Sequence, residues 1–436
     1  MNSKILSLIV AGTVAVGVSA QQPWTLQQCI EQGLKQNISL KMSELSRENQ
    51  SISLDRAKNQ RLPDLSASAS QNLSFGQSMN SKGYYDFGNS QSYSGSISAN
   101  VVLFNGFQIS NTIKAQQLNL LSSIEELKKA QESMAVSIAS AYLQVLYNKE
   151  IVQVAQEQEK LSQLQLDRYI NMANLGKIPE GQVSEIRAQL ANDKLNTTQA
   201  KNTLRLSLLD LSQLIELQKW TDFDVTVPTI DMEALRLSVP PAEEIFDYAQ
   251  ANKPSVKSSE LKLKSSEMEL KVAKGGAYPT LSVGASYGNG YYDKGANLGD
   301  QLSKNARTSM GINLSIPIFD RFNTRNSVNS AKIAIKNAEL EVDNAKKSLY
   351  KEIQQAWINA TNALEKYNAS KEAVTQSEIA STFAEEKFNS GKSSAYEYYE
   401  ARMKLVSATS NLLQAKYNYV FTIKILDFYK GEQLTL

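Results

Sequence analysis

Two long stretches without glycine or proline constrain this chain more than any other feature. They are residues 107–175 and 322–390, each 69 residues long. In the second stretch, apolar and small side chains recur at steps of three and four, as Ala331, Ile335, Ala338, Val342, Ala345, Leu349 and, after a change of register, Ile353, Trp357, Ala360, Leu364, Tyr367. This spacing is typical of a long helix packed against other helices. At 1.5 Å per residue each helix would be about 100 Å long, several times the width of an ordinary domain.

The two stretches are copies of one another. Each begins at a similar motif, Phe-Asn-Gly-Phe at 104–107 and Phe-Asp-Arg-Phe at 319–322, and each ends at a Gly-Lys pair, at 176–177 and 391–392. All of these features match at a constant offset of 215 residues. We infer an internal duplication and one elongated unit built from two halves.

The first 20 residues have the character of a secretory signal peptide. Lys4 supplies the positive charge, residues 5–18 the apolar segment, and Val-Ser-Ala at 18–20 a cleavage site of small residues. The alternative, a first transmembrane helix, is disfavoured because the apolar run is short. The only cysteine, Cys29, excludes an internal disulfide. Its flanking glutamines disfavour a lipidation site, so we expect an unmodified thiol.

Four segments alternate between polar and apolar residues with a period of two, which predicts β-strands. They span residues 65–75, 92–103, 280–287 and 309–318. One face of each is apolar, and the other carries Ser, Thr, Asn and Gly with almost no charge. Their length of about 10 residues suits a strand that crosses a membrane. Tyrosine pairs recur in the strand-connecting segments, in Gly-Tyr-Tyr-Asp at 83–86 and at 290–293, as in an aromatic belt at a membrane interface.

The alternative is a soluble sheet covered by helices, but no amphipathic helix is left over to cover it. A membrane sheet cannot keep open edges, and four strands are too few for a barrel. The chain must therefore oligomerise. Two copies would give 8 strands and three would give 12; a polar interior favours a wide, wet lumen and hence three.

The remaining segments predict further helices and the boundaries of the repeats. We expect helix over 24–61 with a break at Asn37, over 180–219, over 242–274 with a break near Asn252 and Pro254, and, after the Gly-Lys pair at 391–392, up to about Tyr429. The first structural repeat would span 21–227 and the second 242–430. An inter-repeat linker at 228–241 joins them, and residues 431–436 form a C-terminal tail.

Taken together, these features resemble the TolC-like outer-membrane efflux protein family. The resemblance rests on the duplicated order helix, two strands, long helix, turn and helix, on the two Phe motifs and on the two Gly-Lys turns. It implies a mainly α fold with transmembrane β-structure, in which long helical hairpins form a periplasmic tunnel. It also implies a trimeric 12-strand β-barrel among the lipids of the outer membrane. The implied partners are two further copies, a periplasmic adaptor protein and an inner-membrane transporter.

The resemblance also suggests two groups of functional residues. The first group would contact the adaptor at the helix turns and comprises Gly176, Lys177, Ile178, Gly391, Lys392 and Ser393; the alternative is that the glycines merely permit the turns. The second would line a periplasmic constriction. Acidic residues six and nine positions after Gly391 are Glu397 and Glu400, where Asp is the familiar residue. Three copies would form two carboxylate rings able to bind cations.

Glu400 also has a structural interpretation. Glu185, Arg187 and Leu190 repeat in the second half as Glu400, Arg402 and Leu405. Glu400 could therefore form an interhelical ion pair instead of lining the constriction.

Composition gives little support to other functions. The chain has no histidine, which excludes His-based triads and His metal sites. No Gly-rich phosphate loop is present, and a net charge of +2 gives no electrostatic case for nucleic acid. We expect no catalysis, no cofactor and no bound metal. The leading hypothesis is a passive outer-membrane exit duct of a tripartite efflux pump for small molecules. The alternatives are a duct for protein secretion and a soluble periplasmic coiled-coil scaffold.

Overall fold

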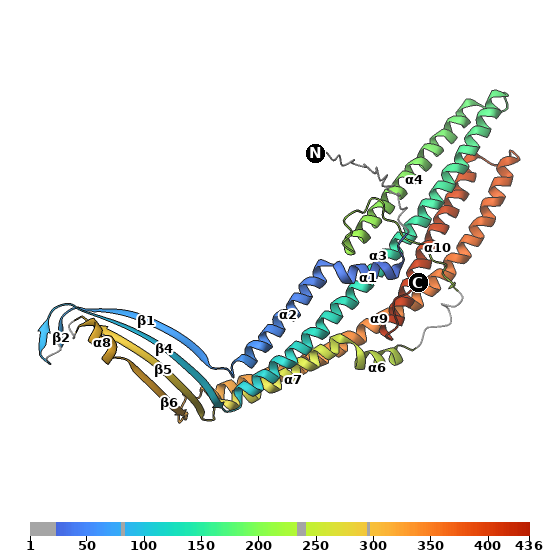
Figure 1. Ribbon diagram of the computed structural model, residues 1–436. Helices are drawn as coiled ribbons and strands as arrows, with labels where there is room; N and C mark the ends of the chain where they lie inside the picture. Colours follow the sequence, from blue (N-terminus) through green and yellow to red (C-terminus); the bar gives the residue numbers. More distant parts are fainter. Residues whose placement is uncertain (1–22, 80–82, 233–240, 294–296) are drawn as a thin grey trace, which may run out of the picture.

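The computed structural model describes residues 23–79, 83–232, 241–293 and 297–436. The molecule is elongated, with a curved β-sheet at one end and two long helical hairpins that reach the other (Figure 1). The predicted signal peptide at 1–20 lies outside the described residues, as does most of the predicted linker at 228–241.

The first half contains a broken helix, two main strands and a long hairpin. Its elements are α1 (Leu26–Gln36), α2 (Ile38–Asn59), β1 (Asp64–Ser74), β2 (Gln77–Met79), β3 (Tyr85–Phe87), β4 (Ser90–Asn105), α3 (Gln108–Asn174) and α4 (Glu180–Leu214). The predicted break at Asn37 is confirmed. The Asn37 side chain accepts hydrogen bonds from the N–H groups of Ser39 and Leu40, so the same residue ends α1 and caps the start of α2.

The second half repeats this order. Its elements are α6 (Ala242–Asn252), α7 (Pro254–Gly275), β5 (Thr280–Tyr292), α8 (Leu298–Lys304), β6 (Arg307–Ser315), α9 (Asn323–Asn389) and α10 (Ala395–Tyr429). Both long helices have 67 residues, which confirms the prediction from the two stretches without glycine or proline.

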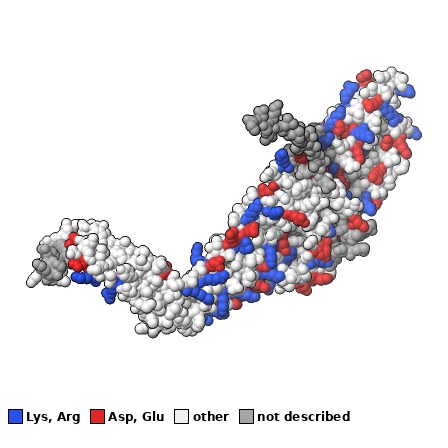
Figure 2. All heavy atoms as spheres, in the orientation of Figure 1, with Lys and Arg blue, Asp and Glu red and all other residues white. Residues whose placement is uncertain are grey.

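The four main strands form one antiparallel sheet in the order β1-β4-β5-β6. Serine hydroxyls pair across neighbouring strands at 2.7–2.9 Å on one face, as Ser66–Ser98, Ser68–Ser96, Ser70–Ser94 and Ser286–Ser309. The other face is apolar and uncovered, with Leu65, Met310 and Ile312 each more than 70% exposed. Figure 2 shows few charged side chains over the sheet, whereas both signs are spread over the helices. An apolar face of this kind is suited to lipid.

The sheet differs from the sequence prediction in three places. Tyr291 and Tyr292 lie inside β5, not beyond its end. The last strand ends at Ser315, so the expected strand residues Ile316 and Ile318 lie beyond it. Pro317 has no N–H to donate to a ladder, which gives the physical reason. The short helix α8 and the β2–β3 pair, which the period-two pattern did not indicate, are additional elements.

The Phe motifs form the turns from the sheet into the long helices. Phe107 and Phe322 both have left-handed backbone conformations, with φ of 63° and 61°. Their rings pack edge to face against Phe104 and Phe319 at centroid distances of 5.2 and 5.5 Å. The side chain between them caps the helix: in the second copy, the Asp320 carboxylate accepts a 2.7 Å hydrogen bond from Thr324 N–H, and this bonding lowers the pKa of Asp320.

Two apolar clusters hold the helices together midway along the molecule. The first joins α1, α3 and the ends of α4 and α10, and it includes Ile138, Leu146 and Leu211, which are fully buried. Cys29 lies in this cluster, and burial raises the pKa of its thiol to about 12. The thiolate, which is the reactive form of cysteine, is therefore disfavoured at this position. The second cluster joins α6, α9 and α10 around Ile245, Ile353 and Ile423.

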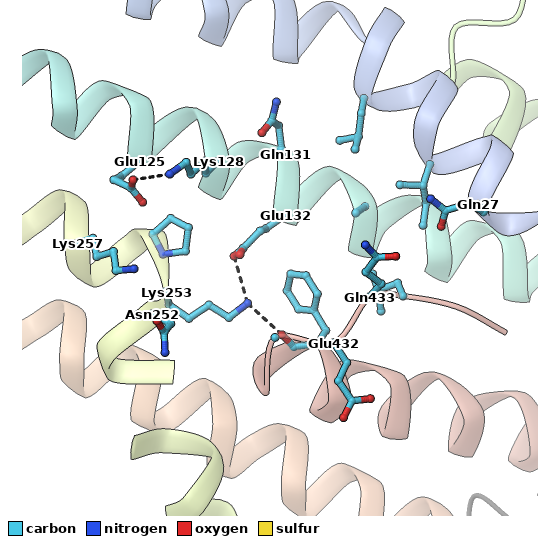
Figure 3. A pocket seen from close by; sticks show the side chains of 17 residues that line it. Gln27, Glu125, Lys128, Gln131, Glu132, Asn252, Lys253, Lys257, Glu432 and Gln433 are labelled. Carbon is cyan, nitrogen blue, oxygen red and sulfur yellow. Dashed lines mark hydrogen bonds and ion pairs between the residues drawn. The ribbon is translucent and has the colours of Figure 1, made fainter. Parts of the chain in front are cut away.

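A buried lysine connects these helices at the break between α6 and α7. The Lys253 ammonium donates to the Glu132 carboxylate at 3.3 Å and to the Phe428 carbonyl at 3.2 Å, and it lies 3.7 Å from the centre of the Phe428 ring. Figure 3 shows Lys253 reaching across a pocket between α3, α7 and the chain after α10. Burial lowers the pKa of Lys253, and this effect outweighs the opposing effect of Glu132.

Candidate functional site

The turns at the far ends of the hairpins have the same backbone geometry in both halves. Gly176 and Gly391 have φ of 71° and 73°, and a Cβ at either position would meet no atom within 4 Å. The following residue donates back to the last helical turn: Lys177 N–H to Met172 and Lys392 N–H to Lys387. This pattern is a glycine C-cap. The glycines are therefore required by the backbone and not by neighbouring side chains.

The remaining predicted contact residues have different surroundings. Lys177 and Lys392 are exposed at the two turns, where their ammonium groups are open to solvent. Ile178 packs against a small apolar cluster around Leu166 and Ile186. Ser393 is half-buried and donates a hydrogen bond to a backbone carbonyl at 3.2 Å. All six residues lie at one end of the molecule, but only the two lysines offer freely accessible charges.

The predicted constriction residues lie together on the first turns of α10. Glu397 is exposed, and its backbone N–H donates the N-cap hydrogen bond to the Ser394 hydroxyl oxygen. Both Glu397 and Glu400 line a hollow of about 310 Å³ between α9 and α10. Within one chain the two carboxylates thus lie on the same face of α10, next to Ala380 and Ala401, whose small side chains leave this hollow open.

Within the described part of one chain, Glu400 forms no ion pair with another helix. Glu400 pairs with Lys404, one turn along the same helix, at 2.8 Å. The bond and charge of Glu400 raise the pKa of Lys404. The two side chains are four residues apart and stay on one helix face, so Glu400 has no need of a partner from another helix.

The interhelical role belongs instead to Arg402, which is 9% exposed. Its guanidinium donates to the Gln158 side-chain oxygen on α3 at 2.7 Å and to the Tyr398 hydroxyl at 2.9 Å. Arg187, the equivalent residue of the first hairpin, is exposed. The two halves of the molecule thus differ at this position, because Arg402 contacts the first hairpin whereas Arg187 faces solvent.

Further contacts join the two hairpins close to the turns. The Gln165 amide donates to the Tyr398 hydroxyl at 2.6 Å and accepts from the Tyr399 hydroxyl at 3.1 Å. Arg168 donates to the Asn389 side chain at 2.8 Å. We call this set, with Gln158 and Arg402, the hairpin clasp. Burial, with a smaller contribution from the neighbouring Tyr398, raises the pKa of Tyr399.

A stack of three rings supports the clasp. Tyr169 of α3 stacks on Phe388 of α9, and Phe388 stacks on Tyr398 of α10, with centroid distances of 5.8 and 4.9 Å. The rings are nearly parallel, within 7°. The stack and the hydrogen bonds together resist separation of the hairpins at this end.

The sequence prediction missed the clasp, although it contained one clue. The repeat of Glu185, Arg187 and Leu190 as Glu400, Arg402 and Leu405 suggested a structural role for Glu400, not for Arg402. The acceptors of Arg402, Gln158 and Tyr398, lie 244 and 4 residues away. No spacing rule identifies such a distant partner.

Among the described residues there is no group of three or more His, Cys, Asp or Glu side chains that could hold a metal ion. None of the described helices has the length and apolar character needed to cross a membrane.

Comparison with known proteins agrees with this architecture. The family of outer membrane efflux proteins matches residues 29–215 and 245–428. The chain is 22% identical to the outer membrane protein TolC of Escherichia coli over 96% of its length and 84% of TolC. The fold superimposes on crystal structures of CusC (TM-score 0.78, 16% identity, 94% and 92% of the two chains) and of VceC from Vibrio cholerae (TM-score 0.74, 16% identity, 94% and 96%).

The matched residues include all four main strands and both hairpins, up to Phe428 of α10. The family assignment also agrees with an outer-membrane location and a periplasmic helical part. This chain belongs to the outer membrane efflux protein family, whose members form exit ducts for efflux pumps.

Proposed function

We propose that three copies of this chain form a passive duct that carries small molecules out through the outer membrane. The observation that supports this most strongly is the sheet of a single chain. It has an apolar, uncovered face and two outer strands, β1 and β6, whose outer edges pair with no other described strand. In lipid those edges need partners. Joining β6 of one copy to β1 of the next would satisfy them and close 12 strands.

The soluble-scaffold alternative fits this sheet poorly. In water, exposed residues such as Met310 at 81% and Ile312 at 75% would form an apolar patch with nothing to cover it. The family assignment also favours the membrane location. The protein-secretion alternative keeps the same fold and differs only in cargo.

We propose further that the tips of the hairpins dock to a periplasmic adaptor, which in turn connects to an inner-membrane transporter. The exposed Lys177 and Lys392, at equivalent turns, would supply positive charge to acidic groups of the adaptor. Surface charge pairs mainly affect association rates and salt dependence. Changing both lysines to Glu should slow adaptor binding at low salt, and changing both to Gln should have a smaller effect. If the wild type and both double variants bind the adaptor at the same rate at low salt, the contact does not depend on these charges.

The function is tested by export from cells that lack this gene. Such cells should accumulate a fluorescent pump substrate, and the intact gene should restore its export. Unchanged dye accumulation with a loss of secreted protein would favour the secretion alternative. Catalysis is not required in either case, since the duct is passive.

The proposed carboxylate constriction has its own test. Glu397→Gln with Glu400→Gln should weaken block by divalent cations in planar bilayers, because two rings of three charges would be removed. Glu185→Gln is the matched control: Glu185 is exposed, on α4, and is the first-half equivalent of Glu400. If divalent cations block the double variant and the control channel equally, the acidic residues do not line the constriction.

A further inference from the structure

The apolar face of the sheet contains a hollow of about 600 Å³ near the end farthest from the helices. Its floor is a row of residues paired across three strands, Ala69, Gly95 and Asn289. This row lies on the opposite face from the paired serines, since its residues alternate with Ser68, Ser70, Ser94 and Ser96 along the strands. The hollow exists because two of the three floor residues have little or no side chain.

The next row outward gives the hollow an aromatic, partly polar end. It consists of Gln71, Tyr93 and Tyr291, paired across the same strands. The two tyrosine rings have centroids 6.1 Å apart. The Tyr93 hydroxyl accepts from Gln71 at 3.1 Å and donates to Gln91 at 2.9 Å. Tyrosines near the end of a membrane strand, one of them here hydrogen-bonded through its hydroxyl, are typical of the boundary between lipid tails and water.

The short helix α8 supplies a side wall. Strand β6 begins at Arg307, opposite Gly288, so β5 extends beyond it. There the Gln301 side chain both donates to and accepts from the backbone of Tyr292, each at 2.8 Å. Asn305 donates to the Gly290 carbonyl at 2.7 Å, and Asn289 donates to the Leu302 carbonyl at 2.7 Å. These bonds satisfy backbone groups that have no strand partner and hold Leu302 at the hollow.

We propose that this hollow, defined by Ala69, Gly95, Asn289, Tyr93, Tyr291 and Leu302 and called here the acyl groove, binds an acyl chain of an outer-leaflet lipid. The inference rests on the proposed barrel, in which this face contacts lipid. The acyl groove is continuous with that face, and its residues expose mainly apolar atoms to the hollow. Its tyrosine end lies toward the strand ends, where a lipid headgroup would meet water. The chain would therefore enter with its tail directed toward the helices.

Gly95 offers a direct test. Its φ is ordinary for any residue, and the nearest atom to a Cβ there is the Ser68 carbonyl oxygen, at 3.9 Å. Gly95→Leu should therefore fill the acyl groove without disturbing the strand. Ala99→Leu is the matched control: it adds an apolar side chain to the same face of the same strand, opposite Leu65 and away from the groove.

The full-length protein would be extracted from outer membranes in mild detergent and its bound lipid measured by native mass spectrometry. We expect retained lipid in the wild type and in Ala99→Leu, and about tenfold lower occupancy in Gly95→Leu, as expected for a loss of about 1.4 kcal/mol in binding. The mass of the bound species distinguishes a phospholipid from a saccharolipid. Equal retention in all three proteins, or detergent as the only bound species, would overturn the proposal.

A second variant covers the case in which Gly95→Leu does not fold. Leu302→Gln alters the wall outside the strands, at a side chain that is 49% exposed. It should also reduce lipid retention while the protein keeps its oligomeric state. Retention equal to that of the wild type would overturn the acyl groove and leave the duct intact. Failure of every protein, including the wild type, to oligomerise would instead contradict the proposed function itself.

Discussion

Gly106 and Arg321 occupy the same position in the two repeats, but their surroundings differ. Both have left-handed backbone conformations, with φ of 64° and 56°. A Cβ on Gly106 would overlap the carbonyl oxygen of Gly275 and lie 2.8 Å from the Tyr278 Cβ. Arg321 is exposed and already has a Cβ. The turn at Gly106 is therefore closely packed. The turn at Arg321 has only the conformational cost of a left-handed backbone at a residue with a side chain.

Substitution at these two positions should have unequal effects. Gly106→Val should lower the free energy of unfolding by at least about 2 kcal/mol, because strain and overlap add. Arg321→Gly should change it by less than about 1 kcal/mol, since relief of strain is offset by a more flexible unfolded chain. Midpoints of denaturant unfolding in detergent would measure both. Equal loss of stability would show that packing at Gly275 does not matter.

Lys253 and Asn37 are another pair of equivalent residues, each at a helix break. Asn37 donates to the Leu214 carbonyl at 3.0 Å, and Lys253 donates to the Phe428 carbonyl at 3.2 Å. The lysine brings a buried charge to this position. Its pKa is lowered by burial, whereas an unfolded lysine keeps its proton up to about pH 10.4.

This difference predicts a pH dependence of stability. Between the lowered pKa of Lys253 and about pH 10.4 the unfolded state binds more protons, so the free energy of unfolding rises with pH. Lys253→Met should lose this contribution. Heat-unfolding scans in detergent at several alkaline pH values should therefore show the wild type gaining stability relative to the variant. Parallel pH profiles would mean that the pKa of Lys253 does not change on folding.

At the scale of whole elements, the hairpin clasp is the contact most open to test. Arg402→Met removes two hydrogen bonds from a charged donor, each contributing about 1.5–3 kcal/mol. The hairpins should then separate more readily, and channels in planar bilayers should show a higher conductance. Arg187→Met, in the other hairpin and exposed, is the control and should behave like the wild type. A change in both variants alike would indicate a general effect of lost charge.

Some of the helices and strands could be predicted from the sequence alone, and others could not. Helices α3 and α9 were predictable because 69 residues without glycine or proline leave few alternatives. The strands were predictable from their period of two. Helix α8 was not, because 7 residues are too few for a periodic signal and its position depends on Gln301 contacting the β5 backbone. The clasp depends likewise on pairs such as Arg402 and Gln158, which only the tertiary fold brings together.

At the scale of the whole molecule, the account depends on closure of the sheet. One chain supplies four main strands, with β1 and β6 at the edges. Neither the helical hairpins nor the apolar clusters can pair these edges. A closed wall in lipid therefore requires other copies of the chain, and the polar serine face then becomes the lining of the duct.

The most direct test is the number of chains in the particle extracted from the outer membrane. Light scattering on the purified protein, with the detergent mass subtracted, measures it. The account predicts three chains per particle, extracted only by detergent. A single chain, or protein released from membranes by high salt alone, would contradict the shared barrel, because four strands cannot close by themselves.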